Sequence, residues 1–487
     1  MRVVVIGAGL GGLAAACHLA DKHEVVVLER TSVPGGRAGV FEQDGYRFDT
    51  GPTVLTMTGI LNEAFAATGC DMNEMLSLQP LDPMYRAVFP DGSALRCRFG
   101  VDAMREEIRT QCGAKDAVAF DRFVKWLAEL YELELPNFID RNFDSALDMM
   151  SSPSAIIKLV RMGGLRKLSK TVNRYFEDER LQRLFSFQAM YAGLSPFQAL
   201  SIYAVITYMD CVQGVYFPAG GMHAVAQQLA NAATKAGASF VYDCDVTRIE
   251  RLRSGSVAGV RTAEGAFIRA DAVVANPDLP VAYRELLPEV PAPRITRTGH
   301  YSPSCTVMLT GRTGAPPVDA AHHNIHFGEQ WKEAFIALLK TGRPMPDPSI
   351  LVTLPSLTDA SLAPDGKHTM YALEPMPNLD GNIDWANESA GLRDRLRHTI
   401  AGAGYGGTVE VERVLDPPAW QRTGMERGTP FALSHRFLQT GPFRPSNVER
   451  RVPGLVFAGS NTTPGVGVPM VLLSGKHAAK RVERLSR

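Results

Sequence analysis

The chain has 487 residues, which is more than one hydrophobic core usually supports, so we expect two domains. Lysine and arginine together number 51, as do aspartate and glutamate, and this balance removes global attraction to nucleic acid as a basis for function. Seven cysteines without a CxxC pair and eleven histidines without an HExxH pattern predict neither a disulfide framework nor a metal site.

Residues 1–30 predict a nucleotide-binding βαβ unit. A buried strand over residues 3–6 leads into a helix through Gly7, Gly9 and Gly12, and a second apolar strand ends at Glu29. Gly7 allows the tight turn, Gly9 lets the backbone approach a pyrophosphate, and Gly12 permits close packing of helix on strand. The helix N-terminus offers free amides to the anion, and the Glu29 carboxylate is placed to hold a ribose hydroxyl. The alternative is a plain turn between helix and strand.

A second glycine pair follows this unit. Gly35 and Gly36 precede Arg37, which supplies a fixed cation beside a close-approach turn, and residues 45–52 look like a strand that closes on another tight turn. Nicotinamide dehydrogenases do not need this second loop. The run resembles the flavoprotein superfamily of amine oxidases, protoporphyrinogen oxidase and carotene desaturases, which implies that the nucleotide is FAD. An ordinary hairpin with a surface arginine is the alternative.

The nucleotide fold stops after about residue 75 and resumes later. A glycine turn at residues 220–221 opens a helix that is followed by a strand ending near Val246, a hairpin, and an apolar strand over residues 272–275. Residues 452–460 supply a last buried strand. We therefore predict an α/β fold: a Rossmann-like FAD-binding domain of the glutathione-reductase/amine-oxidase type, with an α+β substrate domain formed by two insertions. The expected FAD domain comprises residues 1–75, 214–285 and 425–487, and the substrate domain residues 76–213 and 286–424.

The turn from Thr463 to Pro469 exposes successive backbone amides and leads into a helix over residues 470–484. If the positive end of this helix points at the N1/C2 edge of the flavin, it favours the charge that the ring gains on accepting hydride. The blander alternative is a turn into a surface helix. Our predicted cofactor-binding residues are Gly7, Gly9, Leu10, Gly12, Glu29, Arg30, Gly35, Gly36, Arg37, Gly51, Pro52, Thr53, Val246, Asn276, Gly459, Gly467, Val468 and Pro469.

Across essentially the whole chain, the runs FDTGPTVLTM, FIDRNFDS, RLFSFQAMYAGLSP, GVYFPAGGMHAV, FRPSN and TTPGVGVPMVLLSGK resemble bacterial-type phytoene desaturases. The resemblance implies non-covalent FAD, a long polyene substrate taken at a membrane surface, and oxygen or a quinone as electron acceptor. Many relatives read THPG where this chain has Thr462-Thr463-Pro464-Gly465, so a histidine-dependent step is not carried over. Residues 315–424 carry motifs of low specificity.

Residues 151–176 form a basic amphipathic stretch without an acidic residue, which can lie on an anionic bilayer. An ordinary pair of core helices with a solvated basic face is an equal alternative. Helices from residues 185–209 either line an apolar tunnel or belong to the core. The predicted first strand leaves no room for a signal peptide, and no apolar run reaches about 18 residues. We expect a cytoplasmic protein that associates peripherally with membranes.

Hydride removal from a hydrocarbon leaves an allylic cation, and a base must then take a proton. Asp140, Asp144 and Asp148 recur every four residues, so a continuous helix would bring them onto one face and raise their pKa values. Asp144 and Asp148 are our catalytic candidates. Capping by Asp144-Ser145 and ion pairing with Arg141 compete with that role.

The predicted function is an FAD-dependent carotene desaturase that introduces double bonds into phytoene by successive hydride abstraction and proton loss, in carotenoid biosynthesis. The enzyme alternatives are a desaturase or isomerase of a later carotenoid, or a flavin amine oxidase. The alternative from another class is a non-catalytic prenyl-lipid carrier of the GDP-dissociation-inhibitor type. The glycine pattern with Glu29 and Arg37 speaks against the carrier.

Overall fold

The computed structural model describes residues 1–485, apart from the side chains of Ala146, Met150 and Ser151. One body of the protein is built on a five-stranded parallel sheet in the order β19-β13-β1-β2-β9. Its strands are β1 (Arg2–Ile6), β2 (Glu24–Leu28), β9 (Ser239–Val241), β13 (Ala272–Ala275) and β19 (Leu455–Phe457). The sheet therefore joins the start, the middle and the end of the chain, and the predicted fold class is confirmed.

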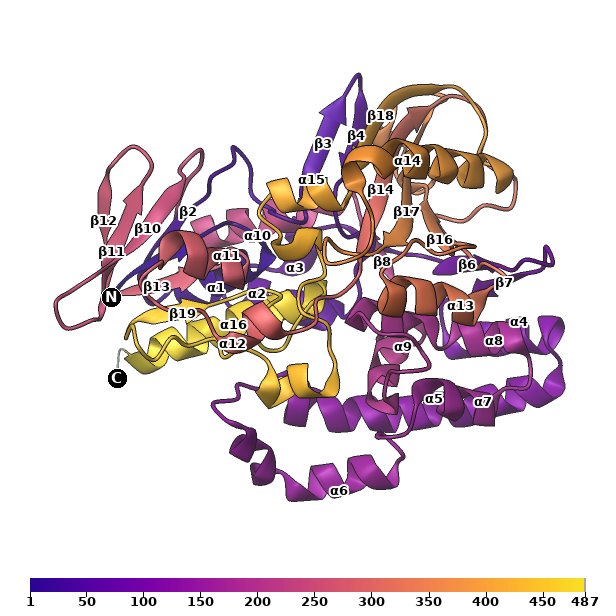
Figure 1. Cartoon of the computed structure of the whole chain (residues 1–487), viewed down its shortest axis with the longest axis horizontal. Helices are drawn as coiled ribbons and strands as arrows, with labels where there is room; N and C mark the ends of the chain where they lie inside the picture. The colour runs from indigo at the N-terminus through magenta and orange to yellow at the C-terminus, as the bar shows by residue number, and fades with distance from the viewer. Residues whose placement is uncertain (486–487) are drawn as a thin grey trace.

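Helices and a small sheet cover the two faces of this parallel sheet (Figure 1). Helix α1 (Leu10–Leu19) packs beside α16 (Val468–Leu485) and α10 (His223–Lys235), with α2 (Thr58–Ala66) next to them. The other face carries an antiparallel sheet of β10 (Val246–Arg251), β11 (Val257–Thr262) and β12 (Phe267–Arg269), together with the short helix α11 (Leu279–Val281). The strands of the parallel sheet are short valine-rich and leucine-rich runs, typical of strands buried on both faces.

The prediction that a strand ends near Val246 is wrong. The parallel strand β9 ends at Val241, and Val246 begins the separate antiparallel strand β10. Between them Asp243 adopts a φ of 52°, a left-handed conformation that aspartate tolerates in turns and that lets the chain reverse direction. The predicted hairpin is present as β11 and β12, and the strand over residues 272–275 is present as β13.

The second body contains a seven-stranded sheet in the order β18-β14-β17-β16-β15-β6-β7. Its strands are β6 (Tyr85–Val88), β7 (Ala94–Cys97), β14 (Ser304–Arg312), β15 (His323–His326), β16 (Ile350–Thr353), β17 (His368–Met376) and β18 (Val409–Leu415). All neighbours pair antiparallel except β15 and β6. The sheet takes strands from both predicted insertions, but the domain boundaries themselves stay a prediction.

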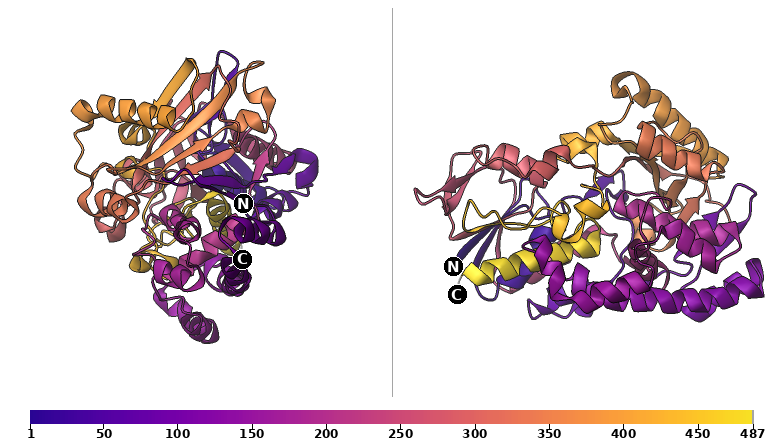
Figure 2. Two further views of the ribbon diagram at one scale, coloured as in Figure 1. Left: turned by 90° about the vertical axis from the view of Figure 1, so that its right-hand side faces the viewer. Right: turned by 60° about the horizontal axis from the view of Figure 1, so that its bottom comes forward.

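Helices surround this sheet in the second body (Figure 1). Helix α14 (Trp385–Gly402) packs on one face through Leu396 and Ile400. The helical layer beside the sheet consists of α4 (Val101–Gln111), α5 (Ala114–Glu134), α6 (Pro153–Arg161), α7 (Leu168–Tyr175), α8 (Glu179–Leu184) and α9 (Ala204–Cys211). Figure 2 shows the long helix α5 (purple) running along this layer while α16 (yellow) lies on the other body.

Short elements connect the two bodies. Strands β3 (Val40–Gln43) and β4 (Tyr46–Asp49) form a hairpin. A second two-stranded sheet pairs β5 (Leu78–Pro80) with β8 (Tyr216–Pro218) from a later part of the chain. The remaining helices are α3 (Met72–Met75), α12 (Arg294–Thr298), α13 (Trp331–Ile336) and α15 (Pro417–Arg422). The Asp49 carboxylate accepts hydrogen bonds from the Met222 and His223 amides at the start of α10, which ties the first hairpin to the parallel-sheet body.

Candidate functional site

A cavity of about 1110 Å³ begins at the turn between β1 and α1 and continues between the helical layer and the seven-stranded sheet. Its first part is lined by glycine loops, and its second part mainly by apolar side chains from α9, β15, β16 and β17. Every predicted cofactor residue lines this cavity except Gly12. A Cβ added at Gly12 would lie 2.1 Å from the Gly7 carbonyl oxygen, so Gly12 is the position where α1 touches β1.

The glycine loops form a close-fitting cradle for a phosphate group. Helix α1 has no side-chain cap at Gly9, so the amides of its first turn are left for a ligand at the cavity. The second loop packs directly on the first, because the Gly35 amide donates to the Ala8 carbonyl at 2.8 Å and a Cβ on Gly36 would lie 3.2 Å from the Gly9 Cα. Side chains at these positions would fill the space that a pyrophosphate needs.

Glu29 ends β2 at the edge of the cradle. Its carboxylate accepts hydrogen bonds from the Ala8 amide at 2.6 Å and from the Thr31 amide and hydroxyl at 3.0 and 2.7 Å. Only 5% of its surface is exposed, and these hydrogen bonds hold the carboxylate in one orientation at the cavity wall, which fits the predicted role toward a ribose hydroxyl. The neighbouring Arg30 guanidinium donates to the Thr423 carbonyl at 2.6 Å, which fixes α15 to this rim.

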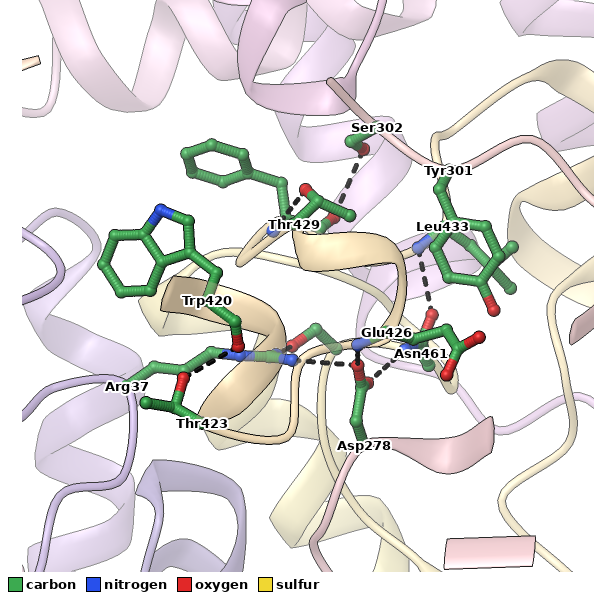
Figure 3. Close-up of polar contacts among 12 residues, drawn as sticks. Arg37, Asp278, Tyr301, Ser302, Trp420, Thr423, Glu426, Thr429, Leu433 and Asn461 are labelled. Atoms are coloured by element: carbon green, nitrogen blue, oxygen red, sulfur yellow. Dashed lines mark hydrogen bonds and ion pairs between the residues drawn. The ribbon is translucent and has the colours of Figure 1, made fainter. Parts of the chain in front are cut away.

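Arg37 joins the second glycine loop to the end of the chain (Figure 3). Its guanidinium donates to the Ser460 hydroxyl and lies 3.3 Å from the Asp278 carboxylate. Asp278 also accepts from the Asn461 amide group and from the Glu426 backbone amide, so it holds three segments together. Sequence reasoning missed Asp278, Ser460 and Asn461. The only signal was their position directly after the apolar strands β13 and β19.

Other predicted residues line the middle of the cavity. A Cβ on Gly51 would lie 1.9 Å from the Arg37 carbonyl oxygen, so the loop with Pro52 and Thr53 packs against the Arg37 turn. The Asn276 side chain donates to the Ala458 carbonyl at 3.0 Å and reaches the space beside Gly9. Val246 and Gly459 complete the wall.

The predicted C-terminal turn lies at the point where the cavity widens. Helix α16 begins at Val468, two residues earlier than the sequence suggested, because Pro469 occupies its first turn and the Val471 amide already bonds to the Gly467 carbonyl at 2.9 Å. Gly467, Val468 and Pro469 all line the cavity. The N-termini of α1 and α16 therefore open onto one cavity, which fits a ligand with a diphosphate at one end and a polar ring at the other.

The apolar part of the cavity contains two buried carboxyl groups that sequence reasoning missed. Glu134 at the end of α5 is 6% exposed, its Oε1 has no partner, and burial raises its pKa well above the ordinary value. Asp210 on α9 is also 6% exposed; burial raises its pKa to about 7, against the hydrogen bond from Gln188. The sequence around these two acids carries no motif, so only the fold could place them.

The catalytic candidates Asp144 and Asp148 do not line the cavity, and no continuous helix carries them. The Asp144 carboxylate pairs with Arg481 of α16 at 2.6 and 3.0 Å. Asp148 forms a capping box with Ser145, and the Asp144 and Ser145 amides that donate to its carboxylate lower its pKa. Asp144 therefore forms an ion pair and Asp148 caps a helix turn, and these are the structural roles that the sequence left open as alternatives to catalysis.

A model of the family described as flavin containing amine oxidoreductase matches residues 10–483. The chain belongs to this family. Within it, the chain is 47% identical over 490 residues to the phytoene dehydrogenase of Streptomyces griseus, with 99% of this chain and 95% of that protein covered. It is 36% identical to the zeta-carotene-forming phytoene desaturase of Myxococcus xanthus, with 99% and 93% covered. These relatives confirm the resemblance that the motifs suggested.

The fold also agrees with that of a solved oxidase. The cyclohexylamine oxidase of Brevibacterium oxydans IH-35A superposes with a TM-score of 0.61 at 18% identity, covering 100% of this chain and 99% of that one. The cofactor of the present chain, as a member of its family, is FAD, and the uncapped N-terminus of α1, the glycine cradle and the buried Glu29 fit that group. In residues 1–485, no cluster of three or more His, Cys, Asp or Glu is arranged to hold a metal ion.

Proposed function

We propose that the protein is an FAD-dependent carotene desaturase that introduces double bonds into phytoene in carotenoid biosynthesis. The observation that carries this proposal is the cavity itself: a polar cradle for the cofactor opens directly into a long apolar chamber. A chamber lined mainly by apolar side chains suits a hydrocarbon, because it offers few polar groups to a substrate that has none. The identity of 47% to a phytoene dehydrogenase supports the same substrate class.

When bound, FAD supplies the hydride acceptor, and the chain supplies position and proton transfer. The two helix N-termini and the Arg37 contacts orient the cofactor, while the apolar walls keep water from the cation left on the substrate. Among the described residues of the cavity wall, Asp210 is the carboxyl group whose pKa lies near neutral pH. A general base works best when its pKa is close to the working pH. We therefore propose that an Asp210 carboxylate oxygen accepts the proton that the substrate loses after hydride abstraction.

The direct test is product analysis. The FAD-loaded protein is incubated with phytoene in liposomes, with a quinone and air present, and the extracted lipid is read by absorption spectroscopy. New absorbance at longer wavelength is expected, and its position counts the conjugated double bonds. The Asp210→Asn variant should retain FAD and lose most of this activity. Unchanged phytoene with flavin bound contradicts the proposal and moves the search to later carotenoids and to isomerisation substrates.

We further propose that α6 docks the protein on a membrane and that substrate enters there. Ile157, Val160 and Leu165 in and after α6 are about half exposed, although they are large apolar side chains. Helix α6 lies at the outer edge of the molecule (Figure 1), and its side chains Ile156, Leu159 and Val160 line the cavity, as does Leu165 after the helix. The half-exposed Val160 and Leu165 therefore lie both at the surface and on the cavity wall, as an entrance from a bilayer requires.

Charge supports the same orientation. The exposed cations of this region form no salt bridge within residues 1–485; they are Lys158, Arg161, Arg166, Lys167, Lys170 and Arg174. Each basic residue near an anionic surface contributes on the order of 1 kcal/mol. None of the helices in the described chain combines the length and apolar character needed to cross a bilayer.

Vesicle sedimentation tests the docking surface. One variant neutralises Lys158, Arg161, Arg166 and Lys167 to glutamine. The matched control neutralises four exposed cations elsewhere: Lys235, Arg253, Arg269 and Lys332. We expect only the first variant to lose binding to phosphatidylglycerol vesicles. Equal binding of both variants would contradict the assignment.

Reoxidation of the flavin completes the cycle, and we propose that a quinone or oxygen performs it. An apolar quinone can reach the cavity through the same entrance as the substrate. Stopped-flow mixing of the photoreduced holoenzyme with a soluble quinone under argon, and separately with air-saturated buffer, compares the two acceptors. If the oxidised flavin spectrum fails to recover with the quinone and also fails to recover with air, this part of the proposal is contradicted.

A further inference from the structure

Arg444 is a fully buried cation directly behind the C-terminal turn. It is 3% exposed, and its side chain donates only to backbone carbonyls: those of Ser460 at 2.5 Å, Leu433 at 3.0 Å, Thr462 at 3.1 Å and Gln439 at 3.2 Å. No carboxylate within residues 1–485 forms a salt bridge with it. Burial lowers its pKa to about 10, so the guanidinium keeps its charge at neutral pH.

A buried charge without a counter-ion is unfavourable, and carbonyl dipoles compensate only part of the lost hydration. The carboxylate that acts on the Arg444 charge is that of Asp278, which already lies 3.3 Å from the Arg37 guanidinium. Two guanidinium groups and one carboxylate therefore surround the turn, which leaves one positive charge in excess. The neighbouring His435 does not change this sum, because burial and the Arg444 charge hold its pKa well below the ordinary value.

Arg444 contacts the turn from within the protein. It does not itself line the cavity, whereas Ser460, Thr462, Pro464 and Gly467 of the same loop do. A Cβ on Gly465 would lie 3.5 Å from the Arg444 Nε, so the guanidinium and the loop are in direct contact. Any ligand group held by the loop therefore feels this charge through a thin layer of backbone, in a low-dielectric environment where charge interactions are strong.

We propose that Arg444 is an internal counter-charge for the reduced flavin ring: a positioning residue that holds the Ser460–Gly467 loop and makes the bound flavin easier to reduce. The ring gains negative charge when it is reduced, so the excess charge behind the loop stabilises the reduced form more than the oxidised form. This inference rests on the proposed placement of the ring at the C-terminal turn. It does not depend on which hydrocarbon is the substrate.

The reduction potential of the holoenzyme tests the inference, because a purely structural residue would change FAD occupancy without moving the potential. Arg444→Gln removes the charge and keeps a donor, and Arg444→Lys keeps the charge. We expect Arg444→Gln to lower the two-electron midpoint potential by about 30 mV or more, which is a tenfold change in the equilibrium constant, and Arg444→Lys to stay closer to the parent protein. Arg312→Met is the matched control, since Arg312 is half-buried, donates to the Tyr405 carbonyl and does not line the cavity.

A FAD-loaded Arg444→Gln protein with the parent potential would overturn the inference. If that variant fails to fold, the parent holoenzyme can still overturn the proposal: the N1 pKa of its reduced flavin should be lower than that of free reduced FAD, because the helix N-terminus and Arg444 act together, and an equal or higher pKa overturns the proposal. Photoreduction needs no carotene. A holoenzyme that shows the expected shift and leaves phytoene unchanged would therefore contradict the desaturase proposal alone, and a desaturase without the shift would contradict the Arg444 proposal alone.

Discussion

The contact between Gly12 and Gly7 allows a sharp test of how the cofactor cradle is built. Replacing Gly12 with alanine places a Cβ 2.1 Å from the Gly7 carbonyl oxygen. Non-bonded carbon contacts lie at about 3.5–4.0 Å, so α1 must move away from β1 by roughly 1 Å or more. Overpacking of this kind costs about 1–3 kcal/mol and occasionally more, and we expect a loss near 3 kcal/mol because the opposing atom is backbone and cannot rotate aside. The same movement displaces the amides that face the pyrophosphate, so FAD retention should fall as well.

Urea unfolding of the FAD-free protein measures the stability term, and flavin absorbance after dialysis measures occupancy. Gly391→Ala is the matched control: Gly391 lies within α14, and a Cβ there meets nothing within 4 Å. Alanine in an exposed helix interior should stabilise the protein by about 0.5–1 kcal/mol relative to glycine. A Gly12→Ala protein with parent stability and full FAD occupancy would refute the close contact between helix and strand.

Four further substitutions address the site and its surroundings. Glu29→Ala should weaken FAD retention by about tenfold or more, because it removes a buried acceptor and leaves the amides around it unpaired, and unchanged FAD after dialysis would sink that role. Asp144→Asn and Asp148→Asn should leave the rate of phytoene turnover nearly unchanged, since neither carboxylate reaches the cavity; a large loss of rate with intact FAD would restore their catalytic assignment. Asp140→Asn should cost about 1–2 kcal/mol at pH 7, because hydrogen bonds from His477 and Lys476 hold the pKa of Asp140 well below its ordinary value. That contribution is present above the unfolded pKa near 4 and is lost as the pH falls through the lower folded pKa, so unfolding curves of variant and parent should converge in acid.

Most strands and turns of the parallel-sheet body could be predicted from local sequence. The glycines after β1 and the pair before Arg37 predicted turns because each position needs either a backbone conformation or a close approach that a side chain prevents. The apolar runs of β13 and β19 predicted buried strands, since a parallel sheet covered on both faces takes residues of one kind. The error at Val246 arose where the chain leaves the sheet after only three residues of β9, a length too short for a periodic signal.

Tertiary contacts decided the residues that local sequence could not. Asp278 is recognisable as a central residue only after Arg37, Asn461 and the Glu426 amide have been brought to it from three parts of the chain. Glu134 sits in an ordinary amphipathic helix pattern, and nothing in its neighbours distinguishes a buried acid from a solvated one. The spacing of Asp140, Asp144 and Asp148 fits one helix face, but α5 ends at Glu134, so the shared face of a continuous helix does not form; the catalytic role of Asp144 and Asp148 stays a prediction.

The distance in sequence between the two glycine-rich turns follows from how α1 and α16 pack. A Cβ on Gly475 of α16 would lie 2.3 Å from the Gly11 carbonyl oxygen and 2.8 Å from the Ala15 amide, so the two helices meet backbone to backbone. At this separation their N-termini open onto the same cavity, one beside Gly9 and the other beside Gly467. A single turn cannot present two helix ends to one ligand. The chain must return to its own beginning, and the seven-stranded sheet and the helical layer are inserted between the two turns, which places the apolar part of the cavity next to the glycine loops.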